Sequence, residues 1–188
     1  MEMIDFIKIY DDPIKIETMS KLLRYANTVK FKEATIIGDN NDHLDKSVRN
    51  TKVYPLDRSS ESMSTVHWAS LLEKVFSDII VDYFKSFNTE NSCTRITDIS
   101  ILKYTEGGFY KYHTDFNIAF PRNISMIYLL NNDYEGGELC FKELKTEEES
   151  IVEKRANRLI IWPSNFIFPH TVKPVKKGIR YSIVGWAA

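Results

Sequence analysis

The hydrophobic pattern of the chain changes near residue 90, and this change most constrains the fold. Beyond it, apolar residues alternate with polar ones or run uninterrupted over short stretches, which Gly, Pro and Asn separate. Short strands separated by turn residues are typical of sandwiches and jelly rolls. The pattern therefore predicts a β core over residues 91–188. The expected strands are 96–104, 124–130, 138–141, 158–162 and 180–186.

Residues 1–90 show the spacing of helices instead. Apolar side chains recur every three or four positions over 64–84 and, more briefly, over 16–26, which predicts two amphipathic helices. Between them, residues 38–63 are rich in Asn, Asp and Ser and are expected to form a surface loop. Two roles stay open for this loop: a lid over a site, or a plain connection.

The composition agrees with a single domain of the α+β class. The 188 residues are 43% hydrophobic and 27% charged, which suits a globular chain with a sizeable core. We expect one domain over 1–188, in which 1–90 forms a helical support and 91–188 carries the site. The net charge of −1 provides no general attraction to nucleic acid or to an anionic membrane.

Cysteine usage and the first residues predict a cytoplasmic or cytosol-like location. Cys93 and Cys140 form no C-x-x-C pair, so a disulfide scaffold or a zinc ribbon is not expected. The acidic start of the chain lacks the apolar stretch of a signal peptide. No apolar run approaches the length of a membrane-spanning helix, so no membrane partner is expected.

The second half contains a candidate metal site. His113 and Asp115 are two residues apart, so on a strand they project from the same face. His170 follows another extended segment and is expected to join them, whereas His43 and His67 lie in the polar loop and near a helix start. Two imidazoles and one carboxylate form the facial triad that binds a ferrous ion and leaves positions open. Taken alone, each residue also fits a surface pair or a hydrogen-bonded core histidine.

A candidate anion site lies near the end of the chain. Arg180 and Ser182 alternate with Tyr181 and Ile183, so both are expected on one face of a strand. An arginine fork and a hydroxyl on the same face can share one carboxylate. Arg180 is ten residues beyond His170, with a turn between them, which favours a hairpin that brings both inward.

At this point the chain resembles a known family, the 2-oxoglutarate- and Fe(II)-dependent oxygenases, and within it the prolyl 4-hydroxylase-like branch. Four blocks in order carry the resemblance and span nearly the whole β half. The blocks are Tyr104-x5-Tyr110-x2-His113-x-Asp115, Arg122-x5-Tyr128-Leu-Leu-Asn131, Glu135-Gly-Gly-Glu-Leu139-x-Phe141 and Pro169-His170-x9-Arg180-Tyr-Ser182.

The resemblance implies a double-stranded β-helix (jelly roll) with helices packed outside it. It implies that His113, Asp115 and His170 are the iron ligands. It also implies that Arg180, with Ser182, holds the distal carboxylate of 2-oxoglutarate. Collagen-type members carry lysine at the place of Arg180 and oxygen-sensing members carry arginine, so this residue stays within the family pattern.

Five further residues receive expected roles from the same resemblance. Tyr104 and Tyr128 match residues of the co-substrate pocket. Arg122 matches a position that often faces the substrate peptide, and Trp186 matches a tryptophan close to the iron in some members. Together with Tyr110, they are expected to bind the substrate. Ordinary core packing remains an alternative for the aromatic residues, and a solvated charge for Arg122.

The implied reaction consumes O2 and 2-oxoglutarate, releases succinate and CO2, and hydroxylates a C–H bond, with ascorbate as a possible reductant. A prolyl residue in a peptide or protein is the leading substrate. A small molecule or free amino acid is an alternative. Alkylated nucleic acid is another, which the near-neutral charge disfavours. A non-enzymatic cupin-like module for a metal or a sugar is a different class, which the combination of triad and arginine disfavours.

Overall fold

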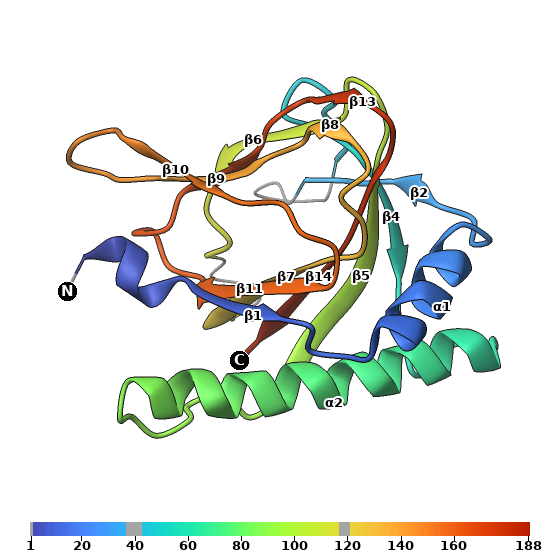
Figure 1. Cartoon of the computed structure of the whole chain (residues 1–188), viewed down its shortest axis with the longest axis horizontal. Helices are drawn as coiled ribbons and strands as arrows, with labels where there is room; N and C mark the ends of the chain where they lie inside the picture. Colours follow the sequence, from blue (N-terminus) through green and yellow to red (C-terminus); the bar gives the residue numbers. More distant parts are fainter. Residues whose placement is uncertain (1, 37–42, 117–120) are drawn as a thin grey trace.

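Two antiparallel sheets lie face to face and enclose the centre of the molecule (Figure 1). The computed structural model describes residues 2–36, 43–116 and 121–188. The elements are a 3-10 helix Met3–Phe6, β1 (Lys8–Asp11), α1 (Ile16–Ala26), β2 (Lys32–Glu33), β3 (Arg49–Asn50), β4 (Lys52–Pro55), α2 (Met63–Ser86), β5 (Ile96–Tyr104), β6 (Phe109–His113), β7 (Ile124–Leu129), β8 (Glu135–Gly136), β9 (Leu139–Lys142), β10 (Glu149–Val152), β11 (Arg158–Pro163), β12 (His170–Val172), β13 (Val175–Lys177) and β14 (Arg180–Ala187).

The strand order identifies the architecture. The seven-stranded sheet runs β1-β11-β7-β14-β5-β4-β2, and the five-stranded sheet runs β10-β9-β12-β6-β3. Strands β5, β7, β11 and β14 of the first sheet face β6, β9, β10 and β12 of the second, and the chain passes repeatedly between the two sheets. This is a jelly roll, or double-stranded β-helix, flanked by helices. The predicted fold class is therefore confirmed.

Strand alternation divides the seven-stranded sheet into two faces. On β7, Met126 and Tyr128 belong to the core that packs on the helices, whereas Ile127 and Leu129 belong to the core between the sheets. The same alternation continues on β14, where Ile183 faces the helices. The inner core therefore consists of every second residue of each strand, and the site is built on this inner face.

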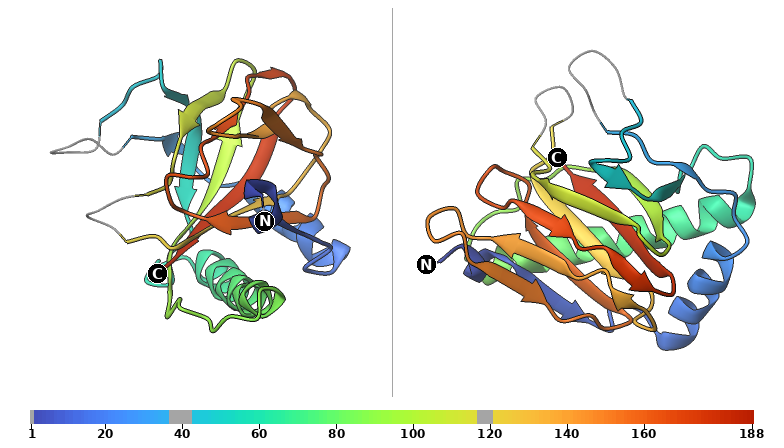
Figure 2. Two further views of the ribbon diagram at one scale, coloured as in Figure 1. Left: turned by 90° about the vertical axis from the view of Figure 1, so that its left-hand side faces the viewer. Right: turned by 90° about the horizontal axis from the view of Figure 1, so that it is seen from above.

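Helix α2 covers the outer face of the seven-stranded sheet, on the side away from the five-stranded sheet (Figures 1 and 2). It begins after Ser62, whose Oγ accepts a hydrogen bond from the Thr65 amide, as an N-cap does. At Gly185 the sheet approaches the helix so closely that a Cβ atom would lie 2.6 Å from the Phe76 ring. Within the described ranges, no helix is both long and apolar enough to cross a membrane.

The first ninety residues also contribute strands, which the sequence analysis did not predict. β1 pairs with β11, β4 with β5, and β3 with β6, so this region extends both sheets. The prediction of a surface loop over 38–63 is wrong for Arg49–Asn50 and Lys52–Pro55, and its residues 38–42 lie outside the described residues. These strands are two to four residues long, too short to establish an alternation, and their pairing partners are distant in sequence.

Candidate active site

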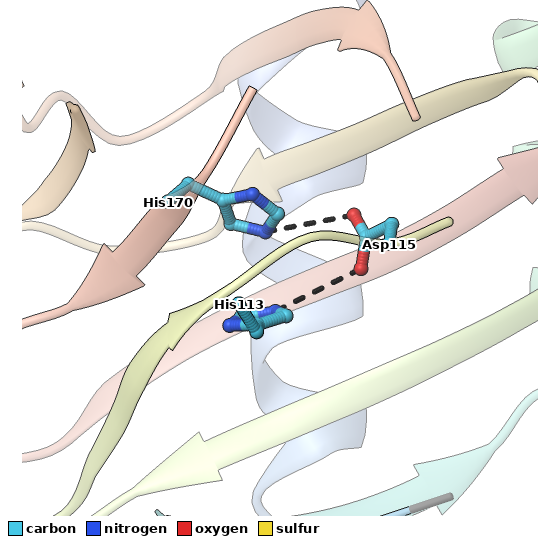
Figure 3. Close-up of side chains that lie close together, drawn as sticks. All are labelled: His113, Asp115 and His170. Carbon is cyan, nitrogen blue, oxygen red and sulfur yellow. Dashed lines mark ion pairs between the residues drawn. The ribbon is translucent and has the colours of Figure 1, made fainter. Parts of the chain in front are cut away.

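Three metal-binding side chains meet between the sheets (Figure 3). His113 ends β6 and His170 begins β12, and the pairing of these strands places the two residues opposite each other. Asp115 follows two residues after His113. The distance from its Oδ1 to His113 Nε2 is 3.7 Å, and the distance from its Oδ2 to His170 Nε2 is 3.5 Å. The predicted grouping of His113, Asp115 and His170 is therefore present.

Both imidazoles are held by their own strands. His113 Nδ1 lies 2.8 Å from the Lys111 carbonyl oxygen, and His170 Nδ1 lies 3.0 Å from the Phe168 carbonyl oxygen. Because a carbonyl only accepts, each Nδ1 carries the proton and donates it. Each Nε2 therefore presents its lone pair toward Asp115, which is the tautomer that a metal ligand requires.

The spacing of the donors fits a single ion. Bonds of about 2.1 Å at right angles place two ligand atoms about 3 Å apart. Both Nε2–carboxylate distances are slightly longer than this, and all three ligand atoms lie within 4.8 Å of one another. Small side-chain adjustments are enough to bring two nitrogens and one oxygen onto a ferrous ion and leave its other positions open.

The electrostatics of the triad favour the unprotonated donors. Burial, and after it the neighbouring His170, lowers the pKa of His113 to about 3. Burial raises the pKa of Asp115, but His170, His113 and the Ser125 hydroxyl lower it by more, so the net pKa is below the ordinary value. At neutral pH the site therefore offers a neutral His113 and a carboxylate at Asp115, the forms in which these groups bind a metal.

Two buried serines support the carboxylate, and the sequence analysis missed them. Ser125 Oγ donates to Asp115 Oδ2 at 2.7 Å and lies 2.7 Å from Ser164 Oγ. Both serines are almost completely buried. In the sequence, Ser125 could have been noticed as a polar residue within the apolar stretch 124–130, at a position that faces inward. A hydrogen bond to one carboxylate oxygen fixes the orientation of the other toward the metal.

We expect Ser125→Ala to weaken metal binding about 10- to 100-fold, the usual effect of losing a hydrogen bond to a metal ligand. Cobalt(II) titration, followed by its visible absorption bands, measures this effect without turnover. Ser70→Ala, on the exposed side of α2, is the matched control and should bind cobalt normally. Unchanged cobalt affinity in the Ser125 variant would show that the hydroxyl does not orient Asp115.

Aromatic rings fix the two histidines from the sides. The Tyr110 ring stacks on His113 with centroids 3.6 Å apart and planes at 19°. Trp162 and Phe141 approach His170 with centroid distances of 4.9 and 5.7 Å. These contacts exclude water and other side-chain positions, so the imidazoles are preorganised for a ligand.

Arg180 is buried without an acidic partner. It is 1% exposed, its Nη1 donates to Ser182 Oγ at 2.6 Å, and its guanidinium lies 5.1 Å from the centre of the Tyr104 ring. Its Nε and Nη2 are buried and have no hydrogen-bond partner among the described residues. A buried cation without a counter-charge is costly. The predicted pair of Arg180 and Ser182 therefore suits an anionic ligand.

A cavity of about 500 Å³ adjoins the triad. The triad opens into it, and Tyr104 forms part of its wall next to Arg180, its partner across β5 and β14. The residues expected to face the substrate, Tyr110, Arg122 and Trp186, also line the cavity.

The prediction for Tyr128 is wrong. Its side chain lies on the helix side of the seven-stranded sheet, and its hydroxyl donates to Asn157 Oδ1. Alternation along β7 directs Ile127 and Leu129 inward, so Tyr128 points away from the cavity. Its role is to join the sheet to the segment before β11.

Arg49 is a cavity residue that the sequence analysis did not identify as one. It lies on β3 opposite Tyr110 of β6, and its guanidinium lies 4.7 Å from the centre of the Tyr110 ring. No local signal marked it, because its position depends on a two-residue strand within a polar stretch.

Comparisons with known proteins agree with this geometry. A model of the 2OG-Fe(II) oxygenase superfamily matches residues 99–188. A PKHD-type hydroxylase of Synechococcus sp. (strain CC9902) is 34% identical over 96 residues, which cover 49% of this chain and 41% of that protein. The chain thus spans less than half the length of this curated relative.

Solved structures share the fold over almost the whole chain. One of them is a prolyl hydroxylase from Trichoplax adhaerens, solved in complex with a hypoxia inducible factor oxygen degradation domain peptide fragment. Its TM-score is 0.73 and its sequence identity is 18%, and the match covers 97% of this chain and 83% of that chain. A Pseudomonas putida prolyl-4-hydroxylase has a TM-score of 0.70 and 18% identity, with coverage of 97% and 91%. Residues 99–188, which contain the whole triad, are therefore similar to the 2OG-Fe(II) oxygenase superfamily, and the solved structures share the fold around them.

Proposed function

We propose that the protein is an Fe(II)- and 2-oxoglutarate-dependent hydroxylase that acts on a prolyl residue of a peptide or protein. The observation that carries the proposal is the combination of a buried His113–Asp115–His170 triad with the unpartnered, buried Arg180 beside the same cavity. A metal-binding module alone would need the triad but not a buried cation without a counter-charge.

Each group has a role in this proposal. His113, Asp115 and His170 would hold the iron, with Ser125 fixing the carboxylate. Arg180 and Ser182 would bind the distal carboxylate of 2-oxoglutarate and so orient its other end toward the metal. The bound iron and 2-oxoglutarate would supply the oxidising chemistry. The chain itself would contribute orientation and exclusion of water, through the rings that pack on the histidines.

A peptide substrate is supported by the comparisons. The curated relatives are named PKHD-type hydroxylases, and the Trichoplax neighbour was solved with a peptide. Tyr110, Arg122 and Trp186 would contact the substrate, because they line the cavity into which the triad opens. Ascorbate would serve as the reductant that keeps the iron in its ferrous form.

The test combines two products of one reaction. The full chain is incubated with Fe(II), 2-oxoglutarate, oxygen and a library of proline-containing peptides, with and without ascorbate. We expect succinate to form in step with the gain of one oxygen atom on a peptide proline. Parallel incubations with free amino acids and with alkylated oligonucleotides examine the alternative substrates. Oxygen transfer only to one of these, or succinate no higher than without the iron, would contradict the proposal.

A further inference from the structure

Two arginines of the cavity are fixed above aromatic rings. The Arg49 guanidinium lies 4.7 Å from the centre of the Tyr110 ring, and the Arg122 guanidinium lies 3.8 Å from that of Trp186. A guanidinium that stacks on a ring keeps its N–H groups directed outward along its own plane. All four residues line the cavity of the triad, so both forks are presented at its wall.

Both guanidiniums have N–H groups that donate no hydrogen bond to the described residues. The Nε of Arg49 and the Nε of Arg122 are buried and have no hydrogen-bond partner among the described residues. Arg49 Nη1 donates to the Thr35 carbonyl at 3.0 Å, which leaves its charge unbalanced. Arg122 Nη2 lies 3.9 Å from Asp98 Oδ2, too far for a hydrogen bond, and the Asp98 side chain is 56% exposed.

Counting only residues 2–36, 43–116 and 121–188, the positive charge around the cavity is incompletely compensated. Among the described residues that line it, the carboxylates are Asp98 and Asp115. Asp115 faces the two histidines, and the exposure of the Asp98 side chain lets solvent screen its charge. A buried donor without a partner destabilises the protein, and a charged donor does so more strongly. A ligand that brings a negative charge to both arginines would offset this destabilisation.

The location connects the two arginines with the site of reaction. Tyr110 stacks on His113 with its ring and lies across the strand pair from Arg49. Burial raises the pKa of Tyr110, and the positive charges of both Arg49 and Arg122 oppose this rise. Both guanidiniums line the same cavity as His113, and that of Arg49 lies against the ring that stacks on this histidine. A group held by them would lie close to the atom that is hydroxylated.

We propose that Arg49 and Arg122 together recognise a carboxylate of the substrate, so that the preferred substrate carries an acidic group close to the prolyl ring. A carboxylate matches the guanidinium fork in shape and charge, whereas a peptide carbonyl satisfies only single donors. The inference rests on the proposed function and specifies its substrate class. The carboxylate has two possible sources: an Asp or Glu side chain next to the proline, or the α-carboxylate of free proline.

The experiment measures binding before it measures turnover. The full chain is loaded with zinc(II), which cannot carry out the oxidation, and with 2-oxoglutarate, and is titrated calorimetrically. The probes are short peptides with a central proline flanked by Asp or Glu, the same peptides with Asn or Gln, free L-proline and L-prolinamide. We expect one acid to bind at least about tenfold more tightly than its amide, as a charged hydrogen bond requires. Whichever pair shows the difference identifies the source of the carboxylate.

Substitutions then test the two residues. Arg49→Gln and Arg122→Gln should each reduce the preference for the acid over the amide, and the double variant should abolish it. Arg49→Lys keeps the charge but loses the fork, so it should retain part of the preference. Arg24→Gln, an exposed arginine of α1, is the matched control and should retain all of it. Thermal unfolding of each metal-free variant, compared with that of the unmodified protein, checks that the variants fold.

The outcomes separate this inference from the proposed function. Equal affinities for the acids and their amides, or an acid preference that survives in the double variant, would overturn the inference. Neither of these results affects coupled succinate formation by an amide peptide, which would still support a hydroxylase. Conversely, a clear acid preference without oxygen transfer to the bound acid would support the carboxylate site and contradict the hydroxylase.

Discussion

His113→Ala is expected to reduce cobalt(II) affinity more than about 100-fold, because loss of a partner that only orients a ligand already costs about 10- to 100-fold. Succinate formation should fall to the background measured without iron. The substitution removes one of three protein ligands, and the two that remain hold the ion too loosely to fix the co-substrate. Cobalt titration and a succinate assay on the same preparation measure both effects.

The control for this variant is His67→Ala. His67 is an exposed histidine of α2, and its ring contacts Trp68 on the far side of the sheet from the cavity. This variant should bind cobalt and form succinate as the unmodified protein does. Thermal unfolding of both metal-free variants checks that the fold is retained. If the His113 variant kept its cobalt affinity or its turnover, the triad would not be the metal site.

Arg180→Met is expected to raise the KM for 2-oxoglutarate by about 30-fold or more, since breaking a buried charge pair costs about 2–5 kcal/mol. The metal-free protein without 2-oxoglutarate should be as stable as before, or more stable. The reason is that Arg180 has no acidic partner there, and an apolar side chain of similar size removes a buried charge. Thermal unfolding with and without 2-oxoglutarate gives the stability, and succinate kinetics give the KM.

A second arginine should show the opposite behaviour. Arg158 is 8% exposed and makes two hydrogen bonds to Asp11, at 2.7 and 3.0 Å. Arg158→Met leaves the Asp11 carboxylate without this partner, so it should lower stability and leave the KM for 2-oxoglutarate unchanged. A loss of stability in the Arg180 variant, together with an unchanged KM, would mean that Arg180 is a structural residue rather than the anion site.

The local hydrophobic pattern of the sequence was sufficient to predict the main helices and strands. The apolar spacing predicted α1, α2 and the principal strands, because a helix or strand buries one face and its period is visible in the chain itself. The site was predictable for the same reason, from the spacing of His113 and Asp115 and from the alternation of Arg180 and Ser182. Each pair lies within one short segment, where the backbone period determines the shared direction.

Residues whose position depends on another segment were missed or misplaced. Tyr128 follows the alternation of β7, but which face of that strand meets the cavity depends on where α2 packs. Ser164 contacts Ser125 across 39 residues, and Arg49 reaches Tyr110 through a strand too short to predict. None of these contacts has a local period, so no pattern in the sequence marked them.

By itself, the sequence determined the two long helices and the principal strands of the second half, the residues that can bind iron, and the arginine suited to a carboxylate, because these depend on local period and on side-chain chemistry. The tertiary structure decided which faces are internal and which serines hold Asp115. It also decided that Arg49 and Arg122 line the same cavity, each with an Nε that has no hydrogen-bond partner among the described residues. The physical reason is that pairing between distant strands sets the surroundings of a side chain, and with them its burial, its partners and its charge balance.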